Sequence, residues 1–339
     1  MTNTSQPDRL IELDALRGVA AVMVLLFHYT WQAPHVVPEV CTVAHGVSWG
    51  SYGVELFFAI SGFVMFMTLE RTQRSADFVV SRFARLFPAY WAGIALTTLT
   101  LALLGPASLA QPPGVVAINL TMLQGFLYLP SVDGVYWSLT IELAFYACMW
   151  ALWRVRALGR IEQILLVWIA LKAVWWLFPD LPSRLGLLLV TQYIPYFAVG
   201  IASYRVWSGE RRWREQLPVL ACGLMVTVLT EPVPAVLVYL ADFTIFAALV
   251  QRRLDRLRHP VLLWLGALSY PIYLVHQFVG YAVMGAIERA GGSVWLATAA
   301  AVAIAFAAAQ AIHVAIEAPA LAAIRGWWRD RAARLSPAE

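Results

Sequence analysis

Two ionisable residues, Arg17 and His28, stand eleven positions apart in the first long apolar segment of the chain. On an α-helix, eleven steps of about 100° bring both side chains to one face, about 16 Å apart along the axis. A neutral imidazole can take a proton from a hydroxyl group, and a guanidinium can hold a phosphate or a carboxylate. Because charge inside a membrane is costly, the pair predicts a functional site. The alternatives are a histidine hydrogen-bonded within the helix packing and an arginine that reaches the headgroups with Asp14 as its partner.

Two carboxylates are placed to support this chemistry. Glu55 enters the second apolar segment at a depth comparable with His28, so it can orient the imidazole as in a hydrolase triad. A solvated glutamate at the membrane interface is the alternative. Glu142 lies more than one helical turn inside the fourth segment and shares a face with Ser138. A carboxylate at that depth requires a cationic or hydrogen-bond-donating partner, or it is protonated.

A second arginine motif precedes the third apolar segment. Arg82 and Arg85 are three residues apart on one predicted helix face, so they can grip one polyanion from two directions. The alternative is an ordinary cluster of cytoplasmic arginines, and the spacing alone favours that alternative.

A polar stripe marks the ninth apolar segment. Ser269, Tyr273 and either His276 or Gln277 recur at intervals of three and four residues, beside Pro271. We predict that this stripe lines a cavity, with hydrogen bonding between helices as the alternative explanation.

Several other polar residues have structural interpretations. Ser61 and Gly62 predict close helix packing, because the serine has no nucleophile motif around it. Lys172, the only lysine, lies within the fifth segment and can either reach the surface or pair with a carboxylate. His313 and Glu317 are four residues apart and can cap a helix end or pair with each other.

The composition indicates what positions these residues. The chain has 339 residues, of which 61% are hydrophobic and 13% charged, as in membrane proteins that cross the bilayer many times. The sequence therefore predicts an all-α polytopic membrane protein with about ten transmembrane helices. The predicted spans are 14–32, 52–70, 86–105, 136–153, 163–178, 185–204, 217–230, 235–251, 260–287 and 293–316.

Arginine sets the predicted orientation. One side of the bundle collects nearly all arginines, whereas the opposite side has only Arg184 and Arg289. By the positive-inside rule, the N and C termini are cytoplasmic. The net charge of +4 is therefore a topological signal, and no nucleic-acid partner is expected.

The remaining segments complete the predicted organisation. Residues 10–317 form one transmembrane domain, and residues 318–339 form a cytoplasmic amphipathic tail. An apolar stretch at 115–129 is predicted to be a re-entrant or interfacial helix, because an eleventh span would invert every later arginine loop. The six histidines show no tight ligand spacing, so no metal site is expected.

The segments together resemble the acyltransferase-3 family, integral membrane acyltransferases that modify sugars of surface polysaccharides and some natural products. Six motifs occur in order over almost the whole chain. They are Leu13–Gly18 with His28, Gly53–Phe58 with Ser61–Phe63, Arg82 with Arg85, Trp137–Glu142, Ser269–His276 and Ile316–Pro319. The chain departs from the family at Glu55, where aspartate is common, and at Leu143, where many members carry a second acidic residue.

The resemblance implies transfer of an acyl group, usually acetyl, from acyl-CoA on the cytoplasmic side to a hydroxyl of a sugar or glycoconjugate. It also implies a bacterial cytoplasmic (inner) membrane location and no permanently bound cofactor, since acyl-CoA is a co-substrate. The implied catalytic base is His28, and the implied donor contacts are Arg17, Arg82 and Arg85. From the residues themselves we predict that Glu55 or Glu142 orients the imidazole as part of the catalytic site. The predicted acceptor or cavity residues are Trp137, Ser138, Ser269, Tyr273 and His276.

A secondary transporter or permease is the alternative from another class, with the buried charges as a substrate or proton path. The two halves of the chain show no repeat and no matched pair of broken helices, which argues against it. The sequence leaves open whether the acceptor is a cell-wall glycan, an exopolysaccharide, a lipid-linked sugar or a small glycoside. Acyl length and oligomeric state are also open.

Overall fold

The protein is an all-helical bundle, as predicted. The computed structural model describes residues 10–43 and 46–335, and within them every regular element is helical. The α-helices are α1 (Ile11–Phe27), α2 (Ala33–Val36), α3 (Gly53–Glu70), α4 (Ser75–Leu104), α5 (Pro113–Asn119), α6 (Trp137–Arg154), α7 (Ile161–Leu177), α8 (Ser183–Leu188), α9 (Ile194–Trp207), α10 (Trp213–Thr230), α11 (Val233–Val250), α12 (Pro260–Arg289), α13 (Val294–Ile312) and α14 (Ala318–Leu335). Within the described chain, six helical segments are long and apolar enough to cross a membrane; they contain α3, α4, α6, α11, α12 and α13.

Each of the ten predicted segments contains a helix, but three segments differ from the prediction. In the first, α1 ends at Phe27 and a π-helical turn, His28–Gln32, follows it. Helix α4 begins at Ser75, eleven residues before the predicted apolar start, because the polar turns around Arg82 and Arg85 are helical as well. The predicted helix at 185–204 is divided into α8 and α9. Pro195 lies in the first turn of α9 and has no N–H to continue a helix from the preceding turn, so a new helix begins there.

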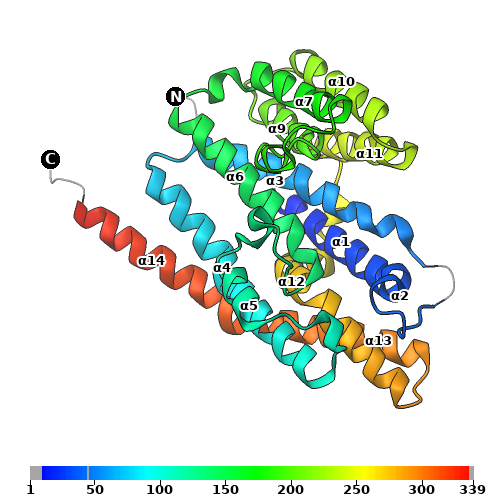
Figure 1. The fold of residues 1–339 in the computed structure, drawn as a ribbon. Helices are drawn as coiled ribbons and strands as arrows, with labels where there is room; N and C mark the ends of the chain where they lie inside the picture. The colour runs from blue at the N-terminus through cyan, green and yellow to red at the C-terminus, as the bar shows by residue number, and fades with distance from the viewer. Residues whose placement is uncertain (1–9, 44–45, 336–339) are drawn as a thin grey trace.

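Helix α12 is the centre of the packing. It packs against α1, α4 and α13, while α3 packs against α1 and α9. Helices α7, α10 and α11 gather around α9 and form the group at the top of Figure 1. The candidate residues on α1, α3, α4, α6 and α12 therefore lie on helices that share the middle of the molecule.

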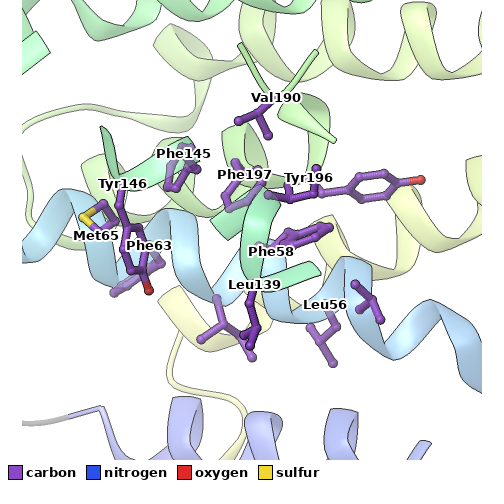
Figure 2. Packing of buried hydrophobic residues seen from close by; sticks show 14 of the residues in the cluster. Leu56, Phe58, Phe63, Met65, Leu139, Phe145, Tyr146, Val190, Tyr196 and Phe197 are labelled. Carbon is purple, nitrogen blue, oxygen red and sulfur yellow. The ribbon is translucent and has the colours of Figure 1, made fainter. Parts of the chain in front are cut away.

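An aromatic core holds α3, α6 and α9 together. The rings of Phe145 and Phe197 stack with centroids 3.9 Å apart, and those of Phe58 and Phe197 stack at 4.8 Å. Figure 2 shows these three rings among the other buried residues of the cluster. Ring stacking of this kind adds to the apolar area that the core buries.

Glycines let the central helices approach closely. A Cβ atom on Gly62 would lie 2.1 Å from the carbonyl oxygen of Phe197, so the predicted close packing at Ser61 and Gly62 is confirmed. At the crossing of α1 and α12, a Cβ on Gly18 would lie 2.6 Å from the backbone nitrogen of Gly266. Small residues at such crossings allow helix backbones to pack directly.

The stretch predicted to be re-entrant is folded back on itself. It contains the seven-residue α5 and a 3₁₀ turn, Gln124–Leu127, and neither is long enough to cross a membrane. The buried Asn119 side chain donates to the carbonyls of Val115 and Pro130 and accepts from the amide of Val132. One side chain thus ties both ends of the stretch together.

The predicted amphipathic tail is helical from Ala318 to Leu335, and residues 336–339 lie outside the described residues. A π-helical turn, His313–Glu317, joins α13 to α14. Helix α14 packs along α4, where the indole nitrogen of Trp328 donates to Asp77 at 2.7 Å. Within the joining turn, His313 Nδ1 lies 2.8 Å from Glu317 Oε2. Of the two predicted roles, helix capping and pairing with each other, the structure therefore shows the pairing.

Gly62→Ala should destabilise the bundle, because the added methyl group would collide with the backbone of α9. We expect a loss of about 1–3 kcal/mol, typical of overpacking, and a lower melting temperature of the purified protein in detergent. Gly159→Ala is the matched control, since a Cβ there meets nothing within 4 Å. Equal melting temperatures for the two variants would contradict the close α3–α9 contact.

Candidate active site

A cavity of about 100 Å³ lies between α1, α3, α4, α6 and α12. It is lined mainly by charged, hydroxyl and aromatic side chains. Seven of the eleven predicted site residues line it: Arg17, Arg82, Arg85, Ser138, Glu142, Ser269 and Tyr273. The polar stripe predicted on the ninth segment therefore faces a cavity through Ser269 and Tyr273.

Two of the cavity arginines are paired with carboxylates. Arg17 Nη1 lies 3.3 Å from Asp14 Oδ1, one helical turn away, as one interpretation of the sequence expected. Arg85 Nη1 lies 2.5 Å from Glu317 Oε1, which comes from the turn between α13 and α14. These pairs hold both guanidinium groups at the arginine-rich end of the cavity.

Arg82 is held differently. Its Nη2 donates to the Thr68 hydroxyl at 3.1 Å, and its guanidinium lies over the rings of Phe78 and Tyr146. Its buried Nε has no hydrogen-bond partner in the described structure. Arg82 therefore has donor capacity available for an anion in the cavity.

Glu142 has the hydrogen-bond donors that its depth requires. Its Oε1 accepts from the hydroxyl of Ser61 at 3.1 Å and from the hydroxyl of Tyr146. Tyr146 lies one turn along the same helix, so its spacing of four from Glu142 was a signal visible in the sequence. Ser61 has a polar role in addition to its place in the close α3–α9 packing.

The hydrogen bonds of His28 fix the tautomer of its ring. His28 Nδ1 lies 2.8 Å from the carbonyl of Val24 and 3.1 Å from Nε2 of His276. His276 Nδ1 faces the carbonyls of Ile272 and Tyr273 at 3.1 and 3.0 Å, so this nitrogen carries the proton and its Nε2 accepts. His28 Nδ1 must therefore be the donor, and His28 Nε2 has a free lone pair.

His28 does not line the cavity, but its partner His276 packs against a residue that does. Tyr273 lines the cavity, and its ring centroid is 5.8 Å from that of His276. The Tyr273 hydroxyl is held by Ser138 at 2.5 Å and donates to the carbonyl of Val135 at 3.0 Å. Printed contacts between side chains therefore link the cavity to His28 through Tyr273 and His276.

The backbone of α12 around His276 is anchored from three sides. Tyr29 donates to the carbonyl of His276 at 2.5 Å, and Tyr136 donates to that of Leu274 at 3.0 Å. The buried Asp133 accepts from the amide of Phe278 at 3.0 Å. These contacts fix the depth of His276 relative to α1 and thereby position its partner, His28.

The structure does not bring Glu55 to His28. Gly53 packs against the backbone of α1, and two helical steps of about 100° turn Glu55 to nearly the opposite face of α3. Glu55 interacts electrostatically with Glu231 and Lys172 instead. Lys172 Nζ lies 2.6 Å from Glu231 Oε1, so the lysine that the sequence left undecided is paired with a carboxylate.

Trp137 and His276 do not line the cavity, but both adjoin residues that do. The Trp137 ring lies 6.5 Å from that of Phe58, a cavity residue, and 5.6 Å from that of Tyr193. It is 43% exposed, so it can be reached from outside the bundle. His276 is fully buried and acts on His28 rather than on the cavity, a role that the sequence alone did not indicate.

Apolar helices long enough to span a membrane, built around a polar cavity and an oriented imidazole, define a multi-pass membrane protein with an enzyme-like site. A family model described as Acyltransferase domain matches residues 10–314. The chain therefore belongs to the acyltransferase-3 family, which its motifs had indicated.

Three relatives are similar to the chain. Acyltransferase MdmB of Streptomyces mycarofaciens is 28% identical, over 93% of this chain and 93% of the relative. Nodulation protein 10 of Rhizobium leguminosarum bv. viciae is 26% identical, over 78% and 82%. Protein 2 in the picA locus of Rhizobium radiobacter is 32% identical, over 50% and 94%. No solved structure matches the chain.

His276→Ala should slow acyl transfer by about tenfold to a hundredfold, mainly through kcat, because His28 would lose a partner that orients its ring. Glu55→Gln should have a much smaller effect, since Glu55 interacts with Lys172 and Glu231. Steady-state kinetics on both purified variants checks the comparison. A larger loss in the Glu55 variant would instead place the carboxylate in the reaction.

Proposed function

We propose that the chain transfers an acyl group, acetyl in the simplest case, from acyl-CoA to a hydroxyl of a sugar or glycoconjugate. The observation that carries the proposal is the free lone pair on Nε2 of His28, whose partner His276 packs against Tyr273 of a cavity with three arginines in its walls. Nε2 of His28 can remove the proton of a hydroxyl group, and the arginines can bind the phosphates of coenzyme A. Family membership favours this function over transport.

The donor is proposed to enter from the end that carries Arg82 and Arg85. Coenzyme A is a polyanion with a slender pantetheine arm, and about 16 Å separates Arg17 and His28 along α1. The arginines would bind the diphosphate while the arm runs through the cavity toward Tyr273 and His28. Holding the donor in this way converts a bimolecular reaction into one between bound groups.

The proposed reaction is a direct transfer. His28 Nε2 removes the proton of the acceptor hydroxyl, and the hydroxyl oxygen attacks the thioester carbonyl carbon. The carbon–sulfur bond then breaks, and the proton passes from His28 to the departing thiolate, so that an ester and free coenzyme A are formed. His276 positions the imidazole throughout, since it holds Nδ1. Glu142, hydrogen-bonded to the hydroxyls of Ser61 and Tyr146, forms part of the cavity wall and takes no part in this proton transfer.

The membrane arrangement is part of the proposal. Ten spans, with both termini cytoplasmic, would place the arginine clusters of the sequence on the side where acyl-CoA is made. The bacterial cytoplasmic membrane provides this arrangement, and a surface glycan or lipid-linked sugar would be acylated there.

His28→Ala should abolish acyl transfer, because it removes the proposed base, and the protein should still fold in membranes. His35→Ala is the matched control: it removes an exposed histidine near the end of the same helical region, whose ring stacks on Trp31. The measurement is release of free coenzyme A thiol by purified protein with acetyl-CoA and a sugar acceptor. Full activity of the His28 variant would rule out its role as the base.

Arg82→Gln should raise the KM for acyl-CoA by about tenfold or more, because a charge-assisted contact to phosphate is lost. The kcat at saturating donor should change less, since Arg82 does not touch the reacting atoms. Arg154→Gln removes an exposed arginine at the end of α6 and serves as the control. An unchanged KM in the Arg82 variant would remove this residue from the donor site.

A further inference from the structure

A groove of about 920 Å³ runs between α4 and α14, outside the cavity described above. Its polar lining includes Arg74 at the start of α4, and Arg325 and Arg329 on successive turns of α14. Because positions four apart on a helix share a face, both α14 guanidinium groups are presented to the same groove.

The groove adjoins the arginine end of the cavity. Arg325 Nη2 donates to the Ser81 hydroxyl at 3.3 Å, and Ser81 directly precedes the cavity residue Arg82. The charge of Arg325 also interacts with those of Arg82 and Arg85. Cationic groups therefore continue from the cavity into the groove.

The positive charge of the groove exceeds its negative charge. Among the residues that line it, the carboxylate is Asp77, which already accepts from Arg74 Nε at 3.2 Å and from Trp328 Nε1 at 2.7 Å. Arg325 bonds a hydroxyl, and Arg329 is exposed. Like charges gathered in one concave surface favour binding of an anion.

The volume of the groove is large enough for the nucleotide of acyl-CoA, which the cavity is too small to hold. A cavity of about 100 Å³ has room for the acyl and thioester end, whereas a nucleotide needs a site of a few hundred Å³. Along coenzyme A the diphosphate follows the pantetheine arm, and the ribose with its 3′-phosphate follows the diphosphate. With the diphosphate at Arg82 and Arg85, the 3′-phosphate falls next to Arg325.

We infer that the α4–α14 groove binds the nucleotide end of acyl-CoA, with the 3′-phosphate held by Arg325 and Arg329. The inference rests on the proposed function and adds a second, separate anion subsite to it. It gives α14 a role in donor selection, in addition to its packing against α4.

The test uses the full-length protein in nanodiscs of zwitterionic lipid and compares coenzyme A with 3′-dephospho-coenzyme A by titration calorimetry. The unmodified protein should bind coenzyme A about tenfold or more tightly. The double variant R325Q/R329Q should lose this preference and keep its affinity for the dephospho form. Arg334→Gln is the control, because Arg334 also lies on α14 but binds the carbonyl of Asp330 instead of lining the groove.

Each other result has one meaning. If the unmodified protein binds neither compound, the acyl-CoA donor and therefore the proposed function are overturned. If it binds both equally, or if the double variant keeps the preference or loses both ligands to the same extent, the 3′-phosphate subsite is overturned while the donor assignment stands. A second titration, with soluble short-chain phosphatidylglycerol, separates a lipid site: if the double variant loses only this binding and keeps the nucleotide preference, the subsite is overturned in favour of a lipid site. Melting temperatures establish that the variants are folded.

Discussion

The hydrogen bond between His28 and His276 is the interaction on which the proposed chemistry depends. It joins residues 248 positions apart in the chain, one in the π-helical turn His28–Gln32 that follows α1 and one on α12. It forms because Gly18 and Gly266 let the two helices cross in direct backbone contact, and because Tyr29, Tyr136 and Asp133 fix the α12 backbone around His276. A ring held in this way presents one nitrogen as a base and keeps the other as a donor. The orienting partner is thus a second imidazole, and not the carboxylate that a hydrolase triad would supply.

The same apolar bundle sets the electrostatics of the cavity. Charges removed from water are stable only when they are paired or hydrogen-bonded, and two of the three cavity arginines have carboxylate partners. Arg82 instead rests on aromatic rings and keeps a buried Nε without a partner. This arrangement suits a ligand that brings its own negative charge. Donor binding and the stability of these half-buried arginines are therefore linked in the proposed mechanism.

Much of this fold could be predicted from local sequence properties. Apolar length located the helices, the depth of Glu142 predicted its donors, and Ser61–Gly62 predicted a close crossing. Seven of the residues predicted from the motifs line one cavity. The sequence did not predict the face of α3 that Glu55 occupies or the partner of His28, because both depend on how neighbouring helices are rotated and shifted in depth. The break before α9 was missed because hydropathy does not register the N–H that Pro195 lacks.

The role of His28 can be tested by a cryo-electron microscopy structure of the protein with a non-reactive acyl-CoA analogue in which a methylene replaces the thioester sulfur. We expect the acyl carbonyl beside His28 Nε2, with room for one hydroxyl oxygen between them, and the diphosphate at Arg82 and Arg85. An analogue bound with its acyl group on another side of the bundle, remote from His28, would contradict the account.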